Sequence, residues 1–115
     1  MSFRFTANAI RNQAKTQTRR LGWEFLREGD YLIAVVQTQG LKKGEKVEII
    51  RVIQVTNVRR ERLCTITKED VEAEGYPDMS QKEFIDMFCS KMGIQPWEYV
   101  TRIVFTYPDI EKVVS

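Results

Sequence analysis

Apolar and polar residues follow two different periods along the chain, and the strand period is the clearer one. Runs rich in β-branched and aromatic side chains predict strands over residues 31–36, 46–58 and 99–107. The first run is apolar at every position, so we expect both of its faces to be covered. Residues 63–66 predict a further short strand at an edge of the sheet.

Apolar residues three and four positions apart predict three helices outside these strands. The first covers residues 6–14, with Thr6 able to cap its N-terminus. The other two begin at capping boxes, in which Thr67 or Ser80 is followed three positions later by an acidic residue. Gly93 is a natural stop for the last helix. The apolar stripe of that last helix is expected to be core: Phe84, Met87, Phe88 and Met92.

The order of these elements favours an α+β fold. Strands occur early, in the middle and at the end, without the regular alternation of a parallel α/β sheet. A small, mixed, curled or barrel-like β-sheet with peripheral helices fits this order better. The length of 115 residues indicates a single domain, 1–115. Trp23, with Phe25 and Leu26, is expected to cover one mouth of the core.

Composition narrows the chemistry that the chain can perform. No apolar run approaches the ~20 residues of a membrane span, and the start lacks the apolar stretch of a signal peptide. Cys64 and Cys89 are isolated from each other in the sequence. We therefore expect a cytoplasmic protein whose two thiols are free. The chain has no histidine, which removes the commonest general base and the commonest zinc ligand. We therefore expect no metal and no cofactor, and catalysis would depend on Lys, Thr, Ser, Glu, Asp, Tyr or Cys.

Charge is distributed unevenly between the two halves of the chain. Residues 1–62 contain 13 Lys or Arg and 6 Asp or Glu, a net charge of +7, whereas residues 63–115 contain 5 and 10, a net charge of −5. A basic half suits phosphate or carboxylate ligands. The alternative is that two oppositely charged halves simply face each other in the fold.

The densest group of polar residues lies in segment 15–23, between the first predicted helix and the first predicted strand. It contains three cations, two hydroxyls and an aromatic ring. Polar groups gathered on a connection between elements are often functional, because a rigid scaffold can aim them into a cleft. This segment is the candidate site.

Four short patterns resemble those of ASCH domains, a branch of the PUA-like superfamily. Residues 15–20, KTQTRR, resemble the K-x-x-[T/E]-x-R signature, and residues 26–30, LREGD, match the L-x-x-G-D turn that follows it. Residues 66–74 have the spacing of a helix of the form L-T-x-x-x-x-x-x-E. Residues 100–105 are similar to a closing V-x-x-I-x-F strand, and a long strand lies between the turn and the helix.

This resemblance implies a small PUA-like β-barrel with peripheral helices, a cleft beside the barrel, and RNA or a modified nucleoside as ligand. One bacterial branch resembles an amidohydrolase that removes the acetyl group from N4-acetylcytidine through a lysine, a threonine and a glutamate. By position these match Lys15, Thr18 and Glu74. Other ASCH domains serve as nucleic-acid-binding modules, and one branch is described as a ribonuclease.

The residues themselves permit such a reaction. Thr18 is a credible nucleophile if a base lies within hydrogen-bond reach. Partial burial and the charges of Arg19 and Arg20 would lower the pKa of Lys15 toward neutrality, which suits a base, and Glu74 could orient it. The alternative is a structural salt-bridge network of Lys15, Arg20 and Glu74, with Thr18 hydrogen-bonding the backbone.

The predicted function is binding of RNA or a modified nucleoside in a basic cleft. Trp23 and Tyr76 could stack on a base, although its neighbours favour a lid on the core as the role of Trp23. One alternative is the amidohydrolase, and another is a protein-interaction module that uses the acidic second half. The residues predicted to bind the ligand are Arg19, Arg20, Trp23, Lys42, Lys43 and Tyr76.

Overall fold

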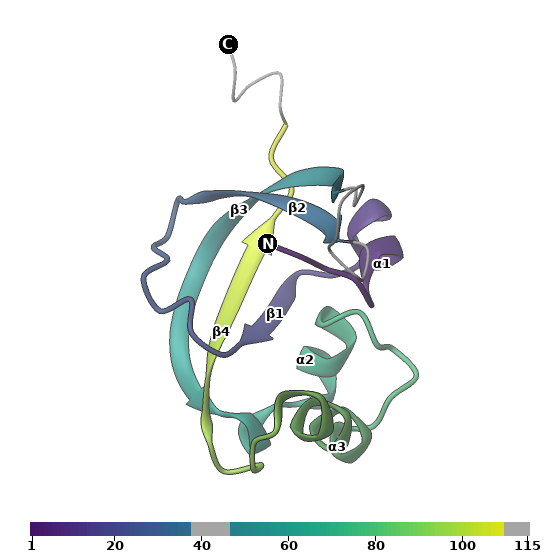
Figure 1. The fold of residues 1–115 in the computed structure, drawn as a ribbon, viewed down its shortest axis with the longest axis vertical. Coiled ribbons are helices and arrows are strands. Elements are labelled where there is room, and N and C mark those ends of the chain that lie inside the picture. Colours follow the sequence, from purple (N-terminus) through teal and green to yellow (C-terminus); the bar gives the residue numbers. More distant parts are fainter. Residues whose placement is uncertain (38–46, 110–115) are drawn as a thin grey trace, which may run out of the picture.

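The computed structural model describes residues 1–37 and 47–109 of the chain. Figure 1 shows a strongly curved sheet with helices beside its concave side. In chain order the elements are α1 (Ala7–Arg11), β1 (Gln17–Arg20), β2 (Tyr31–Gln37), β3 (Val47–Arg62), the 3₁₀ helix η1 (Leu63–Thr65), α2 (Lys68–Ala73), α3 (Gln81–Met92) and β4 (Tyr99–Thr106). No helix among the described residues is long and apolar enough to cross a bilayer.

The four strands form one antiparallel sheet in the order β1-β4-β3-β2. β3 is the longest strand, and its register shifts once against β2, at Ala34/Val35, and once against β4, at Val55/Asn57. Such irregularities bend a strand and increase its twist, and β3 curves along its whole length in Figure 1. The predicted α+β class is confirmed. The described strands form an open sheet, so closure into a barrel stays a prediction.

The N-terminal segment lies along the free edge of β2. Ser2 forms an isolated parallel bridge with Val35, and the Phe3 amide donates to the Val35 carbonyl at 2.8 Å. Phe3 is thereby buried against Phe105 of β4, with ring centroids 6.0 Å apart. Residues just before α1 are thus held over the concave side of the sheet.

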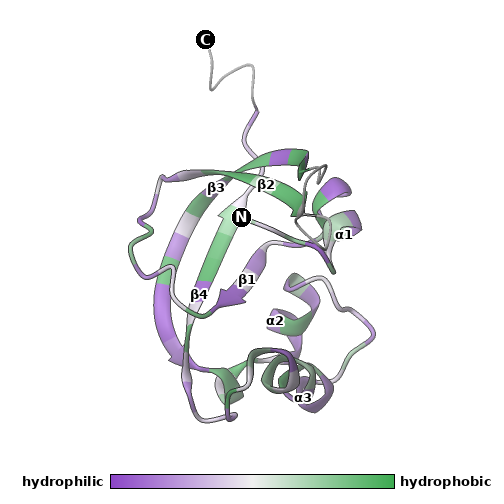
Figure 2. Cartoon of the chain, in the orientation of Figure 1, coloured by the Kyte–Doolittle hydropathy of each residue, from purple (hydrophilic) through white to green (hydrophobic). Residues whose placement is uncertain are grey.

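Buried apolar residues form three clusters rather than one. The largest joins α2, α3 and η1 to the start of β4 through Leu63, Ile66, Val71, Phe84, Phe88 and Val100. A second surrounds Phe3, Ile10, Ala34, Ile53 and Phe105. The third contains Leu26, Val55 and Ile103. Figure 2 shows that β1 and the lower end of β3, next to the helices, are the most hydrophilic parts of the sheet.

The predicted helix ends at Thr67 and Ser80 are confirmed. Each hydroxyl accepts a hydrogen bond from the amide three residues on, and each acidic partner accepts one from the cap amide, which completes two capping boxes. Gly93 has a left-handed backbone, with a φ of 66°, and ends α3 as predicted. The last strand also lies where it was expected, with Ile103 and Phe105 buried.

Two strand predictions are wrong in their details. β2 is covered on one face only, because Ala34 is buried while Tyr31 and Ile33, whose side chains point to the other face, are 51% and 52% exposed. The predicted edge strand over residues 63–66 is instead the 3₁₀ helix η1. β3 extends through the arginine-rich end at Arg62 because β4 pairs with it there, Arg62 opposite Tyr99.

The first helix is shorter than predicted. It ends at Arg11, Gln13 has a φ of 62°, and Ala14 lies beyond the helix. Thr6 occupies the N-cap position, but its side chain makes no capping hydrogen bond. The left-handed backbone at Gln13 reverses the chain and directs it into β1. The predicted connection over residues 15–23 therefore contains a strand, and that strand carries most of the candidate site.

Candidate functional site

A cavity of about 260 Å³ lies between β1, the N-terminal segment and helices α2 and α3. The cavity lies between two of the apolar clusters. Phe84 and Phe88 of the helical cluster line it, and so does Phe3 of the cluster around Phe105. Its polar floor is formed by Lys15, Thr18, Arg19, Arg20 and Glu74. These five residues come from two parts of the chain, residues 15–20, which include β1, and the C-terminal end of α2.

The backbone around Lys15 is fixed from several directions. Its amide donates to the Ala9 carbonyl at 3.1 Å, and the next amide, of Thr16, donates to the Ala73 carbonyl at 2.8 Å. The Tyr107 hydroxyl donates to the Lys15 carbonyl. Burial raises the pKa of Tyr107 to about 12, so this hydroxyl remains a donor at neutral pH. The Lys15 side chain therefore starts from a rigid point between α1, α2 and β4.

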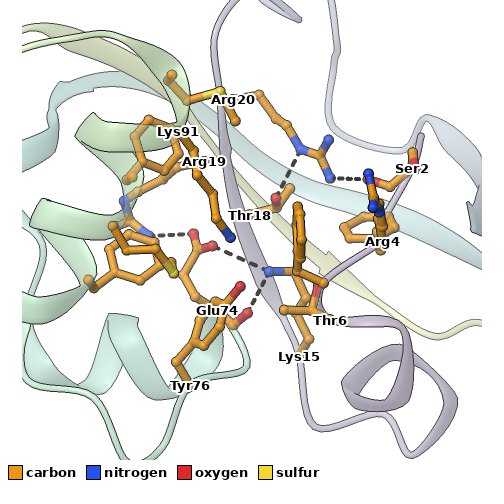
Figure 3. A pocket seen from close by; sticks show the side chains of 16 residues that line it. Ser2, Arg4, Thr6, Lys15, Thr18, Arg19, Arg20, Glu74, Tyr76 and Lys91 are labelled. Carbon is orange, nitrogen blue, oxygen red and sulfur yellow. Dashed lines mark hydrogen bonds and ion pairs between the residues drawn. The ribbon is translucent and has the colours of Figure 1, made fainter. Parts of the chain in front are cut away.

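Lys15 and Glu74 form a buried pair on the floor of the cavity (Figure 3). Lys15 Nζ donates to the Glu74 carbonyl oxygen at 2.5 Å and to Glu74 Oε1 at 3.3 Å, and each residue is only 3% exposed. Burial lowers the pKa of Lys15 below its ordinary value, although the Glu74 carboxylate opposes the shift. The nearby Arg20 and Arg19 charges lower it further. The direction is the one expected from the sequence.

The position of Glu74 depends on the residue that follows it. Glu74 is the C-cap of α2, and Gly75 turns the chain with a φ of 102°. A Cβ at Gly75 would lie 3.2 Å from the Ala9 side chain and 3.3 Å from that of Thr6. Glycine is therefore required both for the backbone angle and for the close approach of α1 to α2. That approach sets the distance between Lys15 and Glu74.

Arg19 is the centre of an ion-pair network. Its Nη1 lies 3.0 Å from Glu74 Oε2, and its Nη2 lies 2.8 Å from Glu61 Oε1 and 3.4 Å from Asp70 Oδ2. The side chain is fully buried, and its Nε has no hydrogen-bond partner. With three carboxylates around it, Arg19 holds the floor of the cavity to both α2 and β3. Its charge is compensated within the protein.

Thr18 and Arg20 lie on the opposite face of β1 from Arg19, as alternate residues of a strand do. Arg20 Nε donates to Thr18 Oγ1 at 3.1 Å, and Arg20 Nη2 donates to the Ser2 carbonyl at 2.7 Å. The guanidinium also lies over the Phe3 ring, 4.8 Å from its centroid. Thr18 Oγ1 is bonded to neither Lys15 nor Glu74 in this structure. Among the described residues, the side chain that donates to this hydroxyl is Arg20.

The walls of the cavity are aromatic and thioether groups. Tyr76 packs edge-on against Phe84, with centroids 5.8 Å apart, and burial raises the pKa of its hydroxyl. Phe88 and Met87 of α3 line the same side, and Met92 reaches the outer part, where it is 44% exposed. The stripe predicted to be core is thus divided, because Phe84 and Phe88 are buried while the methionines are not.

Comparison with known proteins identifies the fold. No protein-family model and no curated protein sequence matches the chain. A solved structure of a protein from Enterococcus faecalis V583, assigned to the family model DUF984, aligns with a TM-score of 0.62 and 15% identity over 90% of this chain and 70% of that one. An ASCH domain from Lactobacillus crispatus JV V101 aligns with a TM-score of 0.59 and 17% identity, over 89% and 69%. The chain has the fold of an ASCH domain.

This ASCH fold brings most of the predicted site residues together. Trp23 is an exception, because it packs on the cluster of Leu26, Val55 and Ile103, in the position expected of a core lid. Lys42 and Lys43 lie outside the described residues. The predicted residues that line the cavity are Lys15, Thr18, Arg19, Arg20, Glu74 and Tyr76.

The predicted salt-bridge network is present in this structure with one change of member. Lys15 and Glu74 pair as that alternative required, but Arg19 completes the network in place of Arg20. Arg20 lies on the other face of β1 and donates to Thr18 instead of leaving that hydroxyl to the backbone. The network also joins the basic first half of the chain to the acidic second half, as the second explanation of the charge asymmetry expected.

Sequence reasoning missed the contribution of the N-terminal segment and of α3 to the cavity. Phe3, Phe5 and Lys91 line it, although none was selected as a candidate. The aromatic-basic-aromatic order of residues 3–5 was the available signal. Among residues 1–37 and 47–109, no group of three or more His, Cys, Asp or Glu is arranged to hold a metal ion.

Proposed function

We propose that the cavity binds a modified nucleoside, with the base on the polar floor. One observation carries the proposal: a pocket open to solvent on one side has aromatic and thioether walls and ends in a floor of oriented donors and acceptors. Its volume of about 260 Å³ is near the lower end for small-molecule sites, which suits one nucleoside rather than a stretch of polymer. Tyr76, Phe84 and Met87 supply apolar contacts, and Lys15, Thr18 and Glu74 supply hydrogen bonds to the edge of a base.

A nucleoside within RNA would enter this cavity only when its base is unstacked and turned outward, the usual state of single-stranded RNA that proteins recognise by sequence. Lys42 and Lys43, which the sequence assigns to the basic flank, lie outside the described residues. The proposed binding site is therefore the cavity itself, and a longer RNA would place one of its nucleosides there.

Hydrolysis of an acyl group on the base, as in N4-acetylcytidine, is the second candidate function. The specific observation in its favour is that Thr18 and a lysine with a lowered pKa line one cavity. Thr18 Oγ1 would attack the acetyl carbonyl carbon, Lys15 in its neutral form would accept the hydroxyl proton, and that proton would pass to the departing exocyclic nitrogen. Water would then hydrolyse the threonine ester to release acetate.

Arg20 has a defined part in this scheme. Its Nε donates to Thr18 Oγ1, and such a donor stabilises negative charge that develops on the oxygen. Lys15 Nζ is bonded to Glu74 in the ligand-free structure, so proton transfer requires Lys15 to turn toward Thr18 or a water molecule to bridge them. Catalytic contacts commonly tighten only when substrate is bound.

The competing explanation is that Lys15, Arg19 and Glu74 only hold the helices to the sheet. Calorimetric titration with N4-acetylcytidine, followed by chromatography of the mixture for released cytidine, separates the possibilities. Saturable binding supports the nucleoside site, and cytidine release that is lost in both Thr18→Val and Lys15→Met supports the hydrolase. Binding without release leaves a binding protein, and no binding at high protein concentration contradicts the proposal.

A further inference from the structure

A surface outside the cavity combines two exposed aromatic rings with an arginine. Trp97 and Tyr99 are 59% and 50% exposed. Arg62, the last residue of β3, pairs with Tyr99 across the sheet, and its Cζ lies 4.8 Å from the centroid of the Tyr99 ring. Arg62 Nη1 also donates to the Trp97 carbonyl at 2.9 Å. These three residues, here called the aromatic–arginine surface, lie where β3 and β4 meet at the lower end of the sheet in Figure 1.

The backbone beneath these rings is fixed by the turn between α3 and β4. The Glu98 carboxylate accepts a hydrogen bond from the Gln95 amide, and the Glu98 carbonyl accepts one from the Leu63 amide at 3.0 Å. The turn is thereby closed on itself and joined to η1. A ligand that packs on Trp97 and Tyr99 meets a backbone that is already ordered, which lowers the entropic cost of binding.

The end of β3 behind the rings is rich in arginine, and one carboxylate there is shared among several of them. Residues 59–62 contain three arginines and one glutamate. Glu61 Oε2 lies 3.3 Å from Arg59 Nη2, Glu61 Oε1 lies 3.8 Å from Arg102 Nε, and the same carboxylate pairs with Arg19. A carboxylate carries a single negative charge, so this sharing leaves positive charge beside the aromatic–arginine surface. An anionic partner fits this end of the sheet.

The aromatic–arginine surface is close to the cavity along the same face of the sheet. Arg20, which lines the cavity, lies opposite Thr101 of β4, and Thr101 lies opposite Arg60 of β3. Arg60 donates to the Thr101 hydroxyl at 3.0 Å and pairs with Glu24 at 3.2 Å. The arginine–tyrosine pair of the surface comes two residues further along both strands, so it points to the same face about 7 Å beyond this row. A strand of a few nucleotides with one base in the cavity can therefore reach it.

Unstacked bases of a single strand fit these groups better than a protein does. Stacking of bases on aromatic side chains and contacts of arginine with phosphates are the usual basis of single-strand binding. Arg62 lies between the Trp97 carbonyl and the Tyr99 ring, so the cation and the stacking faces are side by side. A protein that covered the rings would also bury this guanidinium, which is costly without a paired anion. A phosphate supplies that anion.

We propose that the aromatic–arginine surface binds the nucleotides that flank the nucleoside in the cavity, so that the ligand is a single-stranded nucleic acid. This inference rests on the proposed nucleoside site and names the polymer to which the nucleoside belongs. Bases stack on Trp97 and Tyr99, and Arg62 binds the phosphate between them. RNA and single-stranded DNA share these groups, and the test distinguishes them.

Calorimetric titration compares N4-acetylcytidine with a short oligocytidine that contains one N4-acetylcytidine, in ribose and deoxyribose forms. We expect the oligonucleotide to bind roughly tenfold or more tightly than the nucleoside at low salt, and this advantage should fall as the salt concentration rises. Arg62→Gln and Trp97→Leu should each reduce the advantage and leave the affinity for the nucleoside unchanged. The matched controls are Lys82→Gln on α3 and Tyr31→Leu on β2, which replace an exposed cation and an exposed ring elsewhere and should retain the advantage.

Tryptophan NMR provides a readout that does not depend on variants. The chain has two tryptophans, of which Trp23 packs on the cluster of Leu26, Val55 and Ile103 and Trp97 is exposed. An oligocytidine without the acetyl group should shift the indole signal of Trp97 saturably and leave that of Trp23 nearly unchanged. The free nucleoside should shift neither signal.

The outcomes separate this inference from the function on which it rests. A nucleoside that binds, with an oligonucleotide that binds no more tightly, overturns this inference and leaves the proposed function standing. An advantage that persists in both Arg62→Gln and Trp97→Leu, or a Trp97 signal that stays in place, overturns the assignment to this surface and leaves the rings for a protein partner. Oligonucleotide binding that depends on Arg62 and Trp97, without binding of the nucleoside, supports the surface and contradicts the proposed function. If no probe binds, both proposals fail. A preference for ribose identifies RNA as the polymer, and equal affinity for the two sugars means that stacking and phosphate contacts suffice.

Discussion

Lys15 Nζ donates hydrogen bonds to both the carbonyl oxygen and the carboxylate of Glu74, a residue 59 positions later in the chain. One of these bonds holds the end of the α2 backbone, and the other holds the side chain. Because both residues are nearly excluded from solvent, this contact is a structural link and also part of the cavity floor.

The ammonium of Lys15 should titrate below 10.5, the ordinary value for lysine. Burial disfavours the charged form more than Glu74 favours it, so the folded protein releases this proton before the unfolded chain does. The contribution of Lys15 to stability consequently improves as pH rises from its lowered pKa toward 10.5. Side-chain NMR of labelled lysines measures the titration, with Lys15→Met for assignment and exposed Lys82 for reference. A Lys15 pKa at or above that of Lys82 would refute the prediction.

Glu74→Gln should reduce the free energy of unfolding by about 3 kcal/mol, because it leaves Lys15 and Arg19 facing one another in a buried site. Adding Lys15→Met should recover part of the loss, since only one of the two cations then remains. Chemical denaturation provides the measurement. Asp86→Asn, which removes an exposed ion pair with Lys82, is the control and should change stability little. An equally small effect of Glu74→Gln would show that the buried pair does not stabilise the fold.

Gly75→Ala should be more damaging than Gly22→Ala. Both glycines have a positive φ, but a Cβ at position 75 meets Ala9 at 3.2 Å, whereas a Cβ at position 22 meets nothing within 4 Å. Backbone strain alone costs about 1–2 kcal/mol, and crowding adds to it only at Gly75. The comparison is tested by measuring the thermal unfolding midpoint of each variant and its affinity for N4-acetylcytidine. Equal losses of stability would mean that the approach of α1 to α2 is not constrained there.

Tyr107→Phe should cost about 1 kcal/mol near neutral pH by removing the hydrogen bond to the Lys15 carbonyl. Because burial raises the pKa of Tyr107 from 10.0 to about 12, the hydroxyl contributes fully below pH 10. That contribution is lost as pH rises toward 12. Urea denaturation at a series of pH values should therefore show the two proteins converging at high pH. A difference that is constant or growing above pH 10 would contradict this assignment of the hydroxyl.

Local signals in the sequence were sufficient for the N-terminal ends of α2 and α3, although not for α1. Thr67 and Ser80 define caps with groups only three residues apart, so no knowledge of the rest of the fold is needed. The motif in residues 15–20 likewise identified the strand that carries the floor, although not that it was a strand. β1 has the sequence QTRR, without one apolar residue, and it forms because β4 supplies its hydrogen-bonding partner.

Long-range geometry explains what the sequence did not predict. Arg19 rather than Arg20 pairs with Glu74 because consecutive residues of β1 point to opposite faces, and that consequence follows only when the segment is known to be a strand. Lys91 and Phe5 meet at the cavity although 86 positions separate them in the chain. No local pattern reports such a contact.

The four methionines provide the most direct test of the central claim, that a nucleoside binds in this cavity. Met87 and Met92 line it, whereas Met79 packs on the helical cluster and Met1 packs beside the sheet. With methionine methyl groups labelled for NMR, titration with N4-acetylcytidine should shift the Met87 and Met92 signals saturably and leave those of Met1 and Met79 nearly unchanged. Saturable binding that moves Met1 or Met79 while Met87 and Met92 stay in place would contradict the account.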